Sequence, residues 1–257
     1  MTTAQLDTLK TISGNALDQA ETVWEAVGDE LVCKAAEFSG SLVENRAVSS
    51  QIPGYPIVDD GVPVVDNFIT LVADIRDSTG HLLQAISSHT ADVSQLQRVY
   101  YETSAFLPCL AQVISWHKGA VTEYLGDGLL ALFRAEDPPK EAIYAAYHAS
   151  MAALEAVTLV VNPVIRERYS LPNIDIGIGM AYSKAVVTLV GLAEFKQPKV
   201  FGECVWHAMK VANGRNTIRI DKAMYFAWPK TEGGPVKFSK VVCNGGVEGY
   251  EIQTKKT

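Results

Sequence analysis

The spacing of hydrophobic residues changes near residue 64. Before that point, apolar residues recur at roughly helical spacing, first at Leu6, Leu9, Ile12, Leu17 and Val23, then at Val27, Leu31 and Ala35. Gly40 ends the second stretch, so residues 1–50 are predicted to form a helical extension. Residues 51–65 have the composition of a linker, with Pro53, Gly54, Pro56, Gly61 and Pro63. The core is therefore predicted to begin near Val64.

Beyond the linker, short apolar runs alternate with longer amphipathic ones. The run Phe68–Ala73 predicts a strand that is covered on both faces. A three-to-four spacing predicts an amphipathic helix over residues 91–118, carried by Val93, Leu96, Tyr100, Thr103, Leu107, Leu110 and Ile114. Pro108 is expected to kink or break this helix, and Gly119 to end it.

The remaining pattern predicts two hairpins separated by a second helix. Residues 121–125 and 129–133 flank Gly126-Asp127-Gly128, which is typical of a hairpin turn. Pro138 and Pro139 begin a helix that is expected to stop near Asn162-Pro163. Residues 174–180 and 185–189 predict the second hairpin. The order β-α-β-β-α-β is that of a split ferredoxin-like arrangement, so we expect an α+β fold with helices packed on an antiparallel sheet.

Composition narrows the classes of partner. The chain has 257 residues, 20% of them charged, and a net charge of −7 without any basic block. Nucleic acid and anionic membranes are therefore disfavoured as partners, and an anionic substrate would need cations at its site. The four cysteines are scattered, which predicts a reduced cytoplasmic protein without a zinc site. No leader is evident and no uncharged apolar run reaches about 18 residues, so no membrane span is expected.

Two aspartates are the strongest candidates for chemistry. Asp74 and Asp127 each follow an apolar strand and are 53 positions apart, with the long helix between them. If the two strands are neighbours, both carboxylates converge, as a two-metal phosphoryl-transfer site requires. Taken singly, each has a structural interpretation: Asp74 as a helix N-cap, and Asp127 as ordinary turn chemistry before Gly128.

These segments resemble the class III nucleotidyl cyclases. Residues 68–79 are similar to the family's F-x-D-I-x-G-F-T signature, and residues 124–133 to its (F/Y)-I-G-D-x-(L/V)-(L/M)-A-x-F hairpin. Residues 176–181 match (I/V)-G-I-x-x-G without the closing glycine, and residues 200–202 fall at its V-(I/W)-G. The resemblance covers roughly residues 66–255. It implies a cyclase catalytic domain at residues 66–257.

The resemblance assigns roles residue by residue. Asp74 and Asp127 would hold two divalent ions, Mn²⁺ or Mg²⁺, with the carbonyl of Ile75 as a further ligand. The backbone amides of residues 75–79, among them those of Ile75 and Arg76, and the hydroxyl of Thr79 would receive the triphosphate. The positions that read the base are Glu123 and Lys199. Neither the family's adenine pair nor its guanine pair is complete here.

The chain departs from the family downstream. Trp206 and Lys210 stand where the family has its transition-state asparagine and arginine, so Lys210 or the nearby Arg215 would meet the phosphate charge. Asp77 and Ser78 replace glycine and phenylalanine, and a late phosphate lysine has no counterpart near residues 242–244. The metal-binding residues of the family's active site are thus intact, whereas its base-reading residues are altered. In this combination the chain resembles the pyrimidine cyclases of Pycsar anti-phage systems. That resemblance implies UTP, then CTP, as the substrate.

The family also implies a head-to-tail homodimer, because its metal aspartates and transition-state residues come from opposite protomers. Three other interpretations stay open: a purine cyclase that uses Glu123 for guanine, an inactive nucleotide-binding domain, and an RNA-binding module, which the acidic charge disfavours. Glu123 and Lys199 also fit ordinary solvated charges, and Trp206 fits an interface. The five histidines show no ligand spacing and are interpreted as structural.

Overall fold

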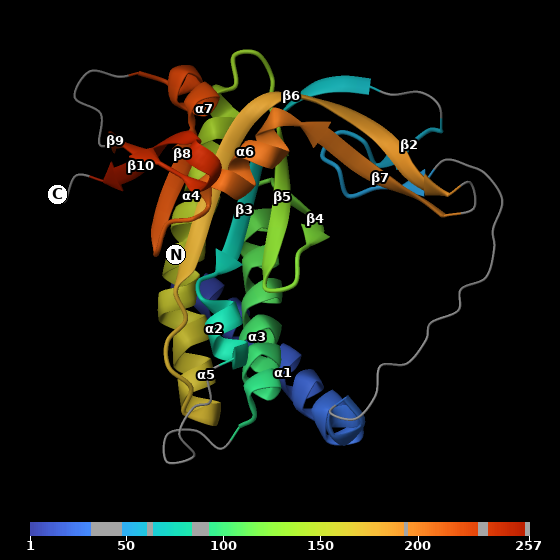
Figure 1. The fold of residues 1–257 in the computed structure, drawn as a ribbon, viewed down its shortest axis with the longest axis vertical. Coiled ribbons are helices and arrows are strands. Elements are labelled where there is room, and N and C mark those ends of the chain that lie inside the picture. The colour runs from blue at the N-terminus through green and yellow to red at the C-terminus, as the bar shows by residue number, and fades with distance from the viewer. Residues whose placement is uncertain (32–47, 61–63, 84–92, 193–194, 231–235, 255–257) are drawn as a thin grey trace.

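The computed structural model places one large twisted sheet at the centre of the molecule, with helices on both faces (Figure 1). It describes residues 1–31, 48–60, 64–83, 93–192, 195–230 and 236–254. For residues 19–20, 23–31 and 254 it describes the backbone alone. The predicted end of the extension at Gly40 and the cysteine Cys33 therefore lie outside the described residues.

Eight strands form the main sheet. They are β3 (Val64–Ile75), β4 (Ala120–Tyr124), β5 (Gly128–Arg134), β6 (Ile176–Leu192), β7 (Phe195–Gly202), β8 (Thr217–Asp221), β9 (Val236–Val242) and β10 (Glu248–Thr254). Their order is β4-β5-β3-β6-β8-β10-β9, and β7 pairs with the outer half of β6. Only β6 and β8 pair in parallel among these described strands. The predicted α+β fold with a predominantly antiparallel sheet is confirmed.

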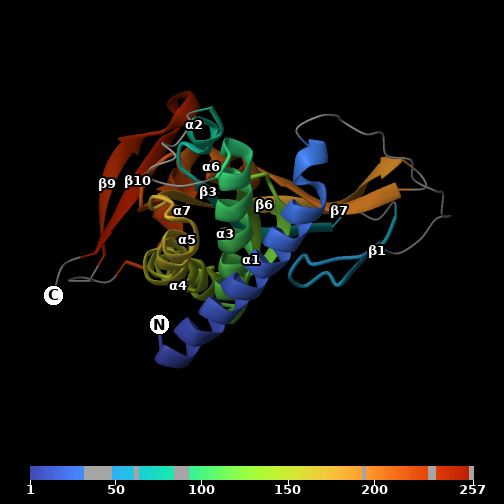
Figure 2. The same ribbon diagram turned by 90° about the horizontal axis from the view of Figure 1, so that it is seen from below.

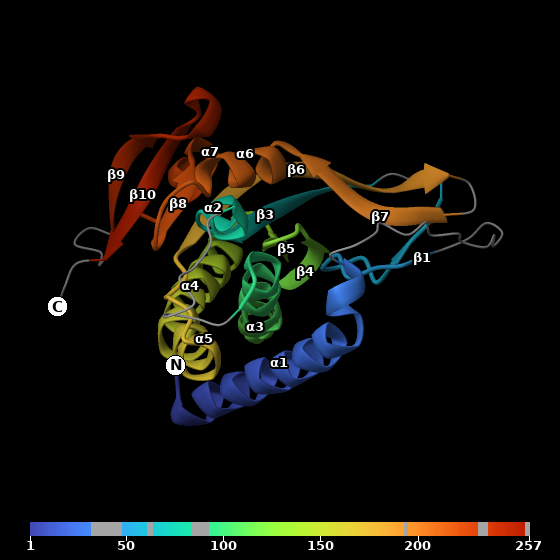
Figure 3. The same cartoon turned by 60° about the horizontal axis from the view of Figure 1, so that its bottom comes forward.

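Helices cover the two faces of this sheet in separate layers. One face carries α3 (Gln95–Trp116), α4 (Lys140–Ala156) and α5 (Asn162–Tyr169), and α1 (Thr3–Leu31) crosses beneath α3 (Figure 2). The other face carries α6 (Glu203–Val211), as Figure 3 shows. The shorter elements are α2 (Ser78–Leu83), α7 (Lys222–Ala227), the hairpin of β1 (Val48–Ser49) and β2 (Ile57–Val58), a π-helix (Val157–Val161) and a 3₁₀ turn (Asn244–Gly246).

The middle of β3, residues 68–73, is apolar apart from Thr70 because both of its faces are covered there. Ile69, Leu71 and Ala73 belong to the core beneath the helices α3–α5. Phe68 and Val72 point the other way, into a second core that includes α6. This second core requires close approach of the helix to the sheet. A Cβ atom added at Gly179 would lie 2.2 Å from the carbonyl oxygen of Ala208 on α6, so only glycine fits there.

The predicted amphipathic helix over residues 91–118 is confirmed as α3, but it does not break at Pro108. Helix α3 continues through Pro108, because packing against the sheet on one side and α1 on the other outweighs the hydrogen bond that proline cannot donate. Its fully buried stripe shares Leu110 and Ile114 with the predicted pattern but is otherwise displaced from it. That stripe is Arg98, Tyr101, Glu102, Ala105, Phe106, Cys109, Leu110, Val113 and Ile114, whereas Leu96 is exposed. The difference arises because α1 covers a flank of the helix that the spacing alone leaves to solvent.

The second helix and the second hairpin also differ from the prediction. The chain does not stop at Asn162-Pro163 but passes through the π-helix into α5, where Pro163 occupies the first turn and needs no backbone donor. The segments at residues 174–180 and 185–189 form one strand, β6, because β3 pairs with it continuously from Val64 to Ile75. Its hairpin partner is β7 instead.

The continuous helical run Lys140–Tyr169 meets the length and composition of a membrane span, at a mean hydropathy of 1.4 over its most apolar window. The sequence analysis expected no such helix. In the fold, 56% of that window is buried inside the protein. Its apolar side chains pack against the sheet and α3, as they do in the core helix of a globular domain.

Candidate active site

The two predicted aspartates emerge at the same end of neighbouring strands. Asp74 is the next-to-last residue of β3 and pairs in register with Gly128 of β5. Asp127 lies in the turn between β4 and β5, and its carbonyl oxygen accepts a hydrogen bond of 3.2 Å from the N–H of Ile75. A Cβ atom at Gly128 would lie 2.7 Å from the carbonyl oxygen of Ala73, so glycine is required for this close approach.

The environment of Asp74 disfavours its charge. Burial raises the pKa of Asp74 to about 6; the guanidinium of Arg76 lowers it, and the neighbouring carboxylate of Asp127 raises it. One carboxylate oxygen, Oδ2, binds Arg76. The other, Oδ1, is buried without a hydrogen-bond partner in the described structure, as is Nε of Arg76. A buried, unpaired carboxylate oxygen beside a second carboxylate is what a divalent cation would satisfy.

The described residues contain no group of three or more His, Cys, Asp or Glu side chains that could hold a metal ion. Two aspartates and the Ile75 carbonyl would thus be the protein's own ligands. Mg²⁺ fits such a sparse set, because it is usually bound by one or two carboxylates together with water and substrate phosphates. The donor set therefore fits a hard cation that arrives with a phosphorylated ligand.

A cavity of about 740 Å³ opens at these aspartates. This volume lies within the range typical of small-molecule sites. Its wall consists of Asp74, Ile75, Arg76, Asp77, Ser78, Thr79, Gly80, His81, Arg98 and Asp127. The segment expected to receive the triphosphate thus forms one side of the cavity. Asp77 has a left-handed backbone with φ of 60°, a conformation that aspartate adopts more readily than most residues.

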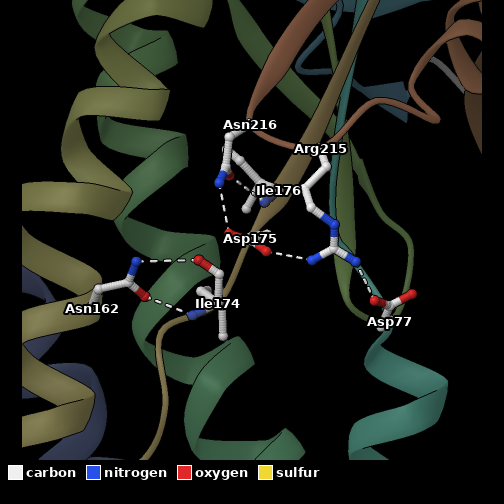
Figure 4. A network of polar contacts seen from close by, with 7 residues as sticks. All are labelled: Asp77, Asn162, Ile174, Asp175, Ile176, Arg215 and Asn216. Atoms are coloured by element: carbon white, nitrogen blue, oxygen red, sulfur yellow. Dashed lines mark hydrogen bonds and ion pairs between the residues drawn. The ribbon is translucent and has the colours of Figure 1, made fainter.

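Arg215 lies against this wall within the same chain (Figure 4). Its guanidinium binds Asp77 of the wall and Asp175, which directly precedes β6. Asn216 supports the arrangement by donating to Asp175 at 2.6 Å and accepting from the N–H of Ile176 at 3.0 Å. Partial burial raises the pKa of Asp175, but hydrogen bonds from Arg215 and Asn216 outweigh it and hold that pKa below its usual value.

The two predicted base-reading residues touch each other. Lys199 on β7 forms an ion pair with Glu123 on β4, although the two strands are not neighbours in the sheet. A shift of register in β4 between Val121 and Glu123 leaves one extra residue opposite β5, and such a bulge changes the direction of the side chain that follows. Both side chains are about one third exposed.

Trp206 and Lys210 lie on one face of α6, with the ammonium of Lys210 5.6 Å from the centre of the Trp206 indole. Trp206 is 49% exposed. These two residues, together with Glu123 and Lys199, are all described, and they lie outside the wall of the cavity at Asp74. In one chain, the predicted site residues therefore fall into two groups: a metal and phosphate group at the cavity, and a second group on β4, β7 and α6.

The sequence analysis missed three residues at the cavity. Arg98 lines it from α3, Glu102 lies buried behind Arg98, and His81, interpreted as structural, also lines the wall. A signal existed, because Arg98 and Glu102 are four apart and would pair on one helix face. That signal was hidden because the predicted buried stripe of the helix did not include them.

The fold of the chain is that of the catalytic domains of class III nucleotidyl cyclases. It is similar to the guanylyl cyclase Cya2, with 20% identity and a TM-score of 0.59 over 74% of this chain and 91% of the other. The adenylyl cyclase CyaB from P. aeruginosa gives 15% identity and a TM-score of 0.60 over 76% of this chain and 97% of the other. The guanylate cyclase domain of RhGC from Catenaria anguillulae, solved with GTP, has 13% identity and a TM-score of 0.51 over 74% of this chain and 98% of the other. No family model and no curated protein matches the sequence.

Proposed function

We propose that this protein is a metal-dependent nucleotidyl cyclase, which converts a nucleoside triphosphate to the 3′,5′-cyclic monophosphate and pyrophosphate. One observation carries the proposal. On a fold shared with cyclases, Asp74 presents a buried, unpaired carboxylate oxygen beside Asp127, in a cavity whose wall is the segment 75–80. That arrangement suits two cations and a polyphosphate.

Each part of the wall has a role in this reaction. Asp74, Asp127 and the Ile75 carbonyl would hold two Mn²⁺ or Mg²⁺ ions, which would neutralise phosphate charge and lower the pKa of the attacking 3′ hydroxyl. Of the predicted amides, those of Ile75 and Arg76 already donate to the carbonyl oxygens of Asp127 and Asp175. The backbone amides of residues 77–79 and the Thr79 hydroxyl would therefore orient the triphosphate. A cation, Lys210 or Arg215, meets the charge that develops on the α-phosphate.

For the base we propose a pyrimidine, UTP first and CTP second. The Glu123–Lys199 ion pair supports this choice, because it brings an acceptor and a donor to one place in the chain. Lys199 suits a uracil carbonyl, and Glu123 accepts the ring N–H. Glu123 facing the amine of cytosine would favour CTP instead. A cyclic pyrimidine nucleotide made in the cytoplasm as an anti-phage signal is the role that the Pycsar resemblance adds.

Two observations support alternatives. The similar structures are those of adenylyl and guanylyl cyclases, and Glu123 is the residue that the family uses for guanine, so a purine cyclase acting on GTP is the first alternative. Trp206 and Lys210 in place of asparagine and arginine favour an inactive nucleotide-binding domain. The orphaned oxygen of Asp74 argues against inactivity, since burying an unsatisfied carboxylate is costly without a ligand.

We also propose a homodimer, because the second group of site residues lies among exposed apolar side chains. Those on the β6–β7 arm and α6 are Val190, Leu192, Phe195, Phe201, Trp206 and Met209. Large exposed apolar side chains that gather on one surface are typical of an interaction site. A head-to-tail partner that covers α6 would bring Lys210 of one chain to the cavity of the other.

The test is incubation with UTP, CTP, ATP and GTP at equal concentration and either Mn²⁺ or Mg²⁺, with products identified by mass spectrometry. Cyclic UMP as the main product supports the proposal, and cyclic CMP supports its second choice. Cyclic GMP as the main product would promote the guanylate alternative. Absence of any cyclic product, when nucleotide still binds, would leave the inactive domain. Asp74→Asn, assayed in parallel, controls for contaminating activity.

A further inference from the structure

Besides the two aspartates, the cavity wall carries a buried arginine that the proposed mechanism does not use. Arg98 comes from α3, at the start of the helix, whereas the aspartates come from the sheet. The residue is only 7% exposed, and yet it lines the cavity. A buried arginine in contact with a cavity is either a structural ion pair or a binding group, and its hydrogen bonds distinguish the two.

Glu102 holds Arg98 by one side of its guanidinium. The Nε–H of Arg98 donates to Oε1 of Glu102 at 2.8 Å, and Nδ1 of His81 lies 2.7 Å from Oε2 of the same carboxylate. Both oxygens of Glu102 are therefore engaged, and Glu102 itself is 1% exposed. Within the described residues, Glu102 is the only recorded acceptor for Arg98, so its two Nη groups keep their donors for a ligand in the cavity.

The charges on the wall indicate what such a ligand is. Asp74, Asp77 and Asp127 contribute three carboxylates, and Arg76 is already bound to Asp74. A polyphosphate that approaches this wall meets repulsion unless further cations line the cavity in addition to any bound between the aspartates. A guanidinium held at Nε presents two parallel N–H groups, the geometry that matches two oxygens of one phosphate.

We propose that Arg98 binds the terminal phosphate of the triphosphate, with Glu102 and His81 as positioning residues that fix its guanidinium. The inference rests on the proposed function and deepens it. It assigns a phosphate-binding group to α3, an element to which the sequence analysis gave no ligand. It also explains why a charged pair lies inside the buried stripe of that helix, where burial of two charges seldom adds stability by itself.

The test measures binding of inorganic triphosphate with Mn²⁺ by calorimetry, which needs no turnover and no base. Arg98→Gln should weaken binding roughly 10-fold to 100-fold, the loss typical of a hydrogen bond between charged groups. Arg98→Lys should recover part of the affinity, because lysine restores the positive charge but cannot donate two parallel hydrogen bonds to one phosphate. Arg134→Gln is the matched control: that arginine pairs with Asp66 near the other end of β5, and its loss should leave triphosphate binding unchanged.

Removal of Arg98 alone leaves Glu102 buried without its cation, so a folding defect must be separated from a binding defect. The double variant Arg98→Gln/Glu102→Gln removes both charges and keeps a neutral pair of similar shape. Equal triphosphate affinity in wild type and in a folded Arg98→Gln or double variant would overturn the inference and leave the proposed function intact. A wild-type protein that fails to bind triphosphate with Mn²⁺ would overturn both.

Discussion

At the scale of single residues, burial makes the ionised form of Asp74 unfavourable in the folded protein. Its pKa of about 6 lies above the usual value of 3.8, chiefly because the carboxyl group is buried. A raised pKa means that the folded protein binds this proton more tightly than the unfolded chain does. The contribution of Asp74 is therefore most favourable below about pH 4, and it is lost as the pH rises to about 6. Above that pH the ionised carboxylate destabilises the fold unless a cation compensates.

Asp74→Asn is accordingly expected to stabilise the protein while it abolishes activity. In the absence of divalent ions, its melting temperature should exceed that of the wild type at about pH 8, and this difference should shrink towards about pH 4. Cyclase activity should fall by more than the roughly 10–100-fold typical of residues behind a metal ligand. Thermal unfolding at both pH values, alongside a turnover assay, measures the two effects.

Asp77→Asn is the matched control for this substitution. Asp77 lies three residues on in the same wall, but it is exposed and asparagine tolerates its left-handed backbone. Loss of its solvent-exposed pair with Arg215 should leave the melting temperature nearly unchanged at either pH. A melting temperature of Asp74→Asn below that of wild type at about pH 8 would contradict the raised pKa.

A site residue can be predicted from the sequence when its position is determined by neighbouring residues, and not when it is determined by packing between distant elements. Asp74 and Asp127 could be located because their positions depend on strand exits and a turn, both of which leave a mark in neighbouring residues. Arg98 could not, because its surroundings are set by α2 and the turn after β3, which the fold packs against the start of α3. The contact of Glu123 with Lys199 depends on a bulge and on a strand pairing that no local pattern encodes.

At the scale of elements, the passage from α5 to β6 depends on one buried side chain. Asn162, at the start of α5, donates to the carbonyl of Ile174 at 3.1 Å and accepts from its N–H at 2.8 Å (Figure 4). These two bonds replace the partners that the backbone of Ile174 lacks just before β6 begins. They fix the entry of the strand that brings Asp175 to Arg215.

Asn162→Ala is therefore expected to destabilise the protein by about 1–3 kcal/mol, the cost of leaving buried backbone groups unpaired. Asn173→Ala, one residue before Ile174, removes an exposed side chain and should change stability by less than about 0.5 kcal/mol. Denaturant unfolding of both variants measures the difference. Equal stability of Asn162→Ala and Asn173→Ala would show that water satisfies the backbone of Ile174 and that the side chain does not fix β6.

The error over β6 has a physical cause at the same scale. Tyr182, Ser183 and Lys184 interrupt the apolar pattern, which favours a turn between two short strands. In the fold these residues pair with Ile69, Phe68 and Asn67 of β3, so the strand continues through them. The polar interruption directly precedes Ala185, where β6 begins to pair with β7 while Ala185 and Val187 stay buried in the second core.

At the scale of the whole molecule, one chain separates its predicted site into two groups. The cavity holds the aspartates and the phosphate segment, and α6 carries Trp206 and Lys210 outside that wall. Arg215, in contrast, binds Asp77 and Asp175 of its own chain. The two candidate cations therefore imply different arrangements of the active site. Lys210 would act across a dimer, and Arg215 would act within the chain that supplies the aspartates.

Mixing inactive variants distinguishes these two arrangements. A dimer of one Asp74→Asn chain and one Lys210→Ala chain contains one site with both defects and one site with neither, so equal mixing should restore about a quarter of the wild-type rate. A dimer of Asp74→Asn with Arg215→Ala has one defect in each site, because Arg215 and the aspartates belong to the same chain, and it should stay inactive. Turnover is measured after subunit exchange has been verified by mass spectrometry. An active Lys210→Ala parent would remove Lys210 from the mechanism, and recovery in the Arg215→Ala mixture would place Arg215 across the dimer instead.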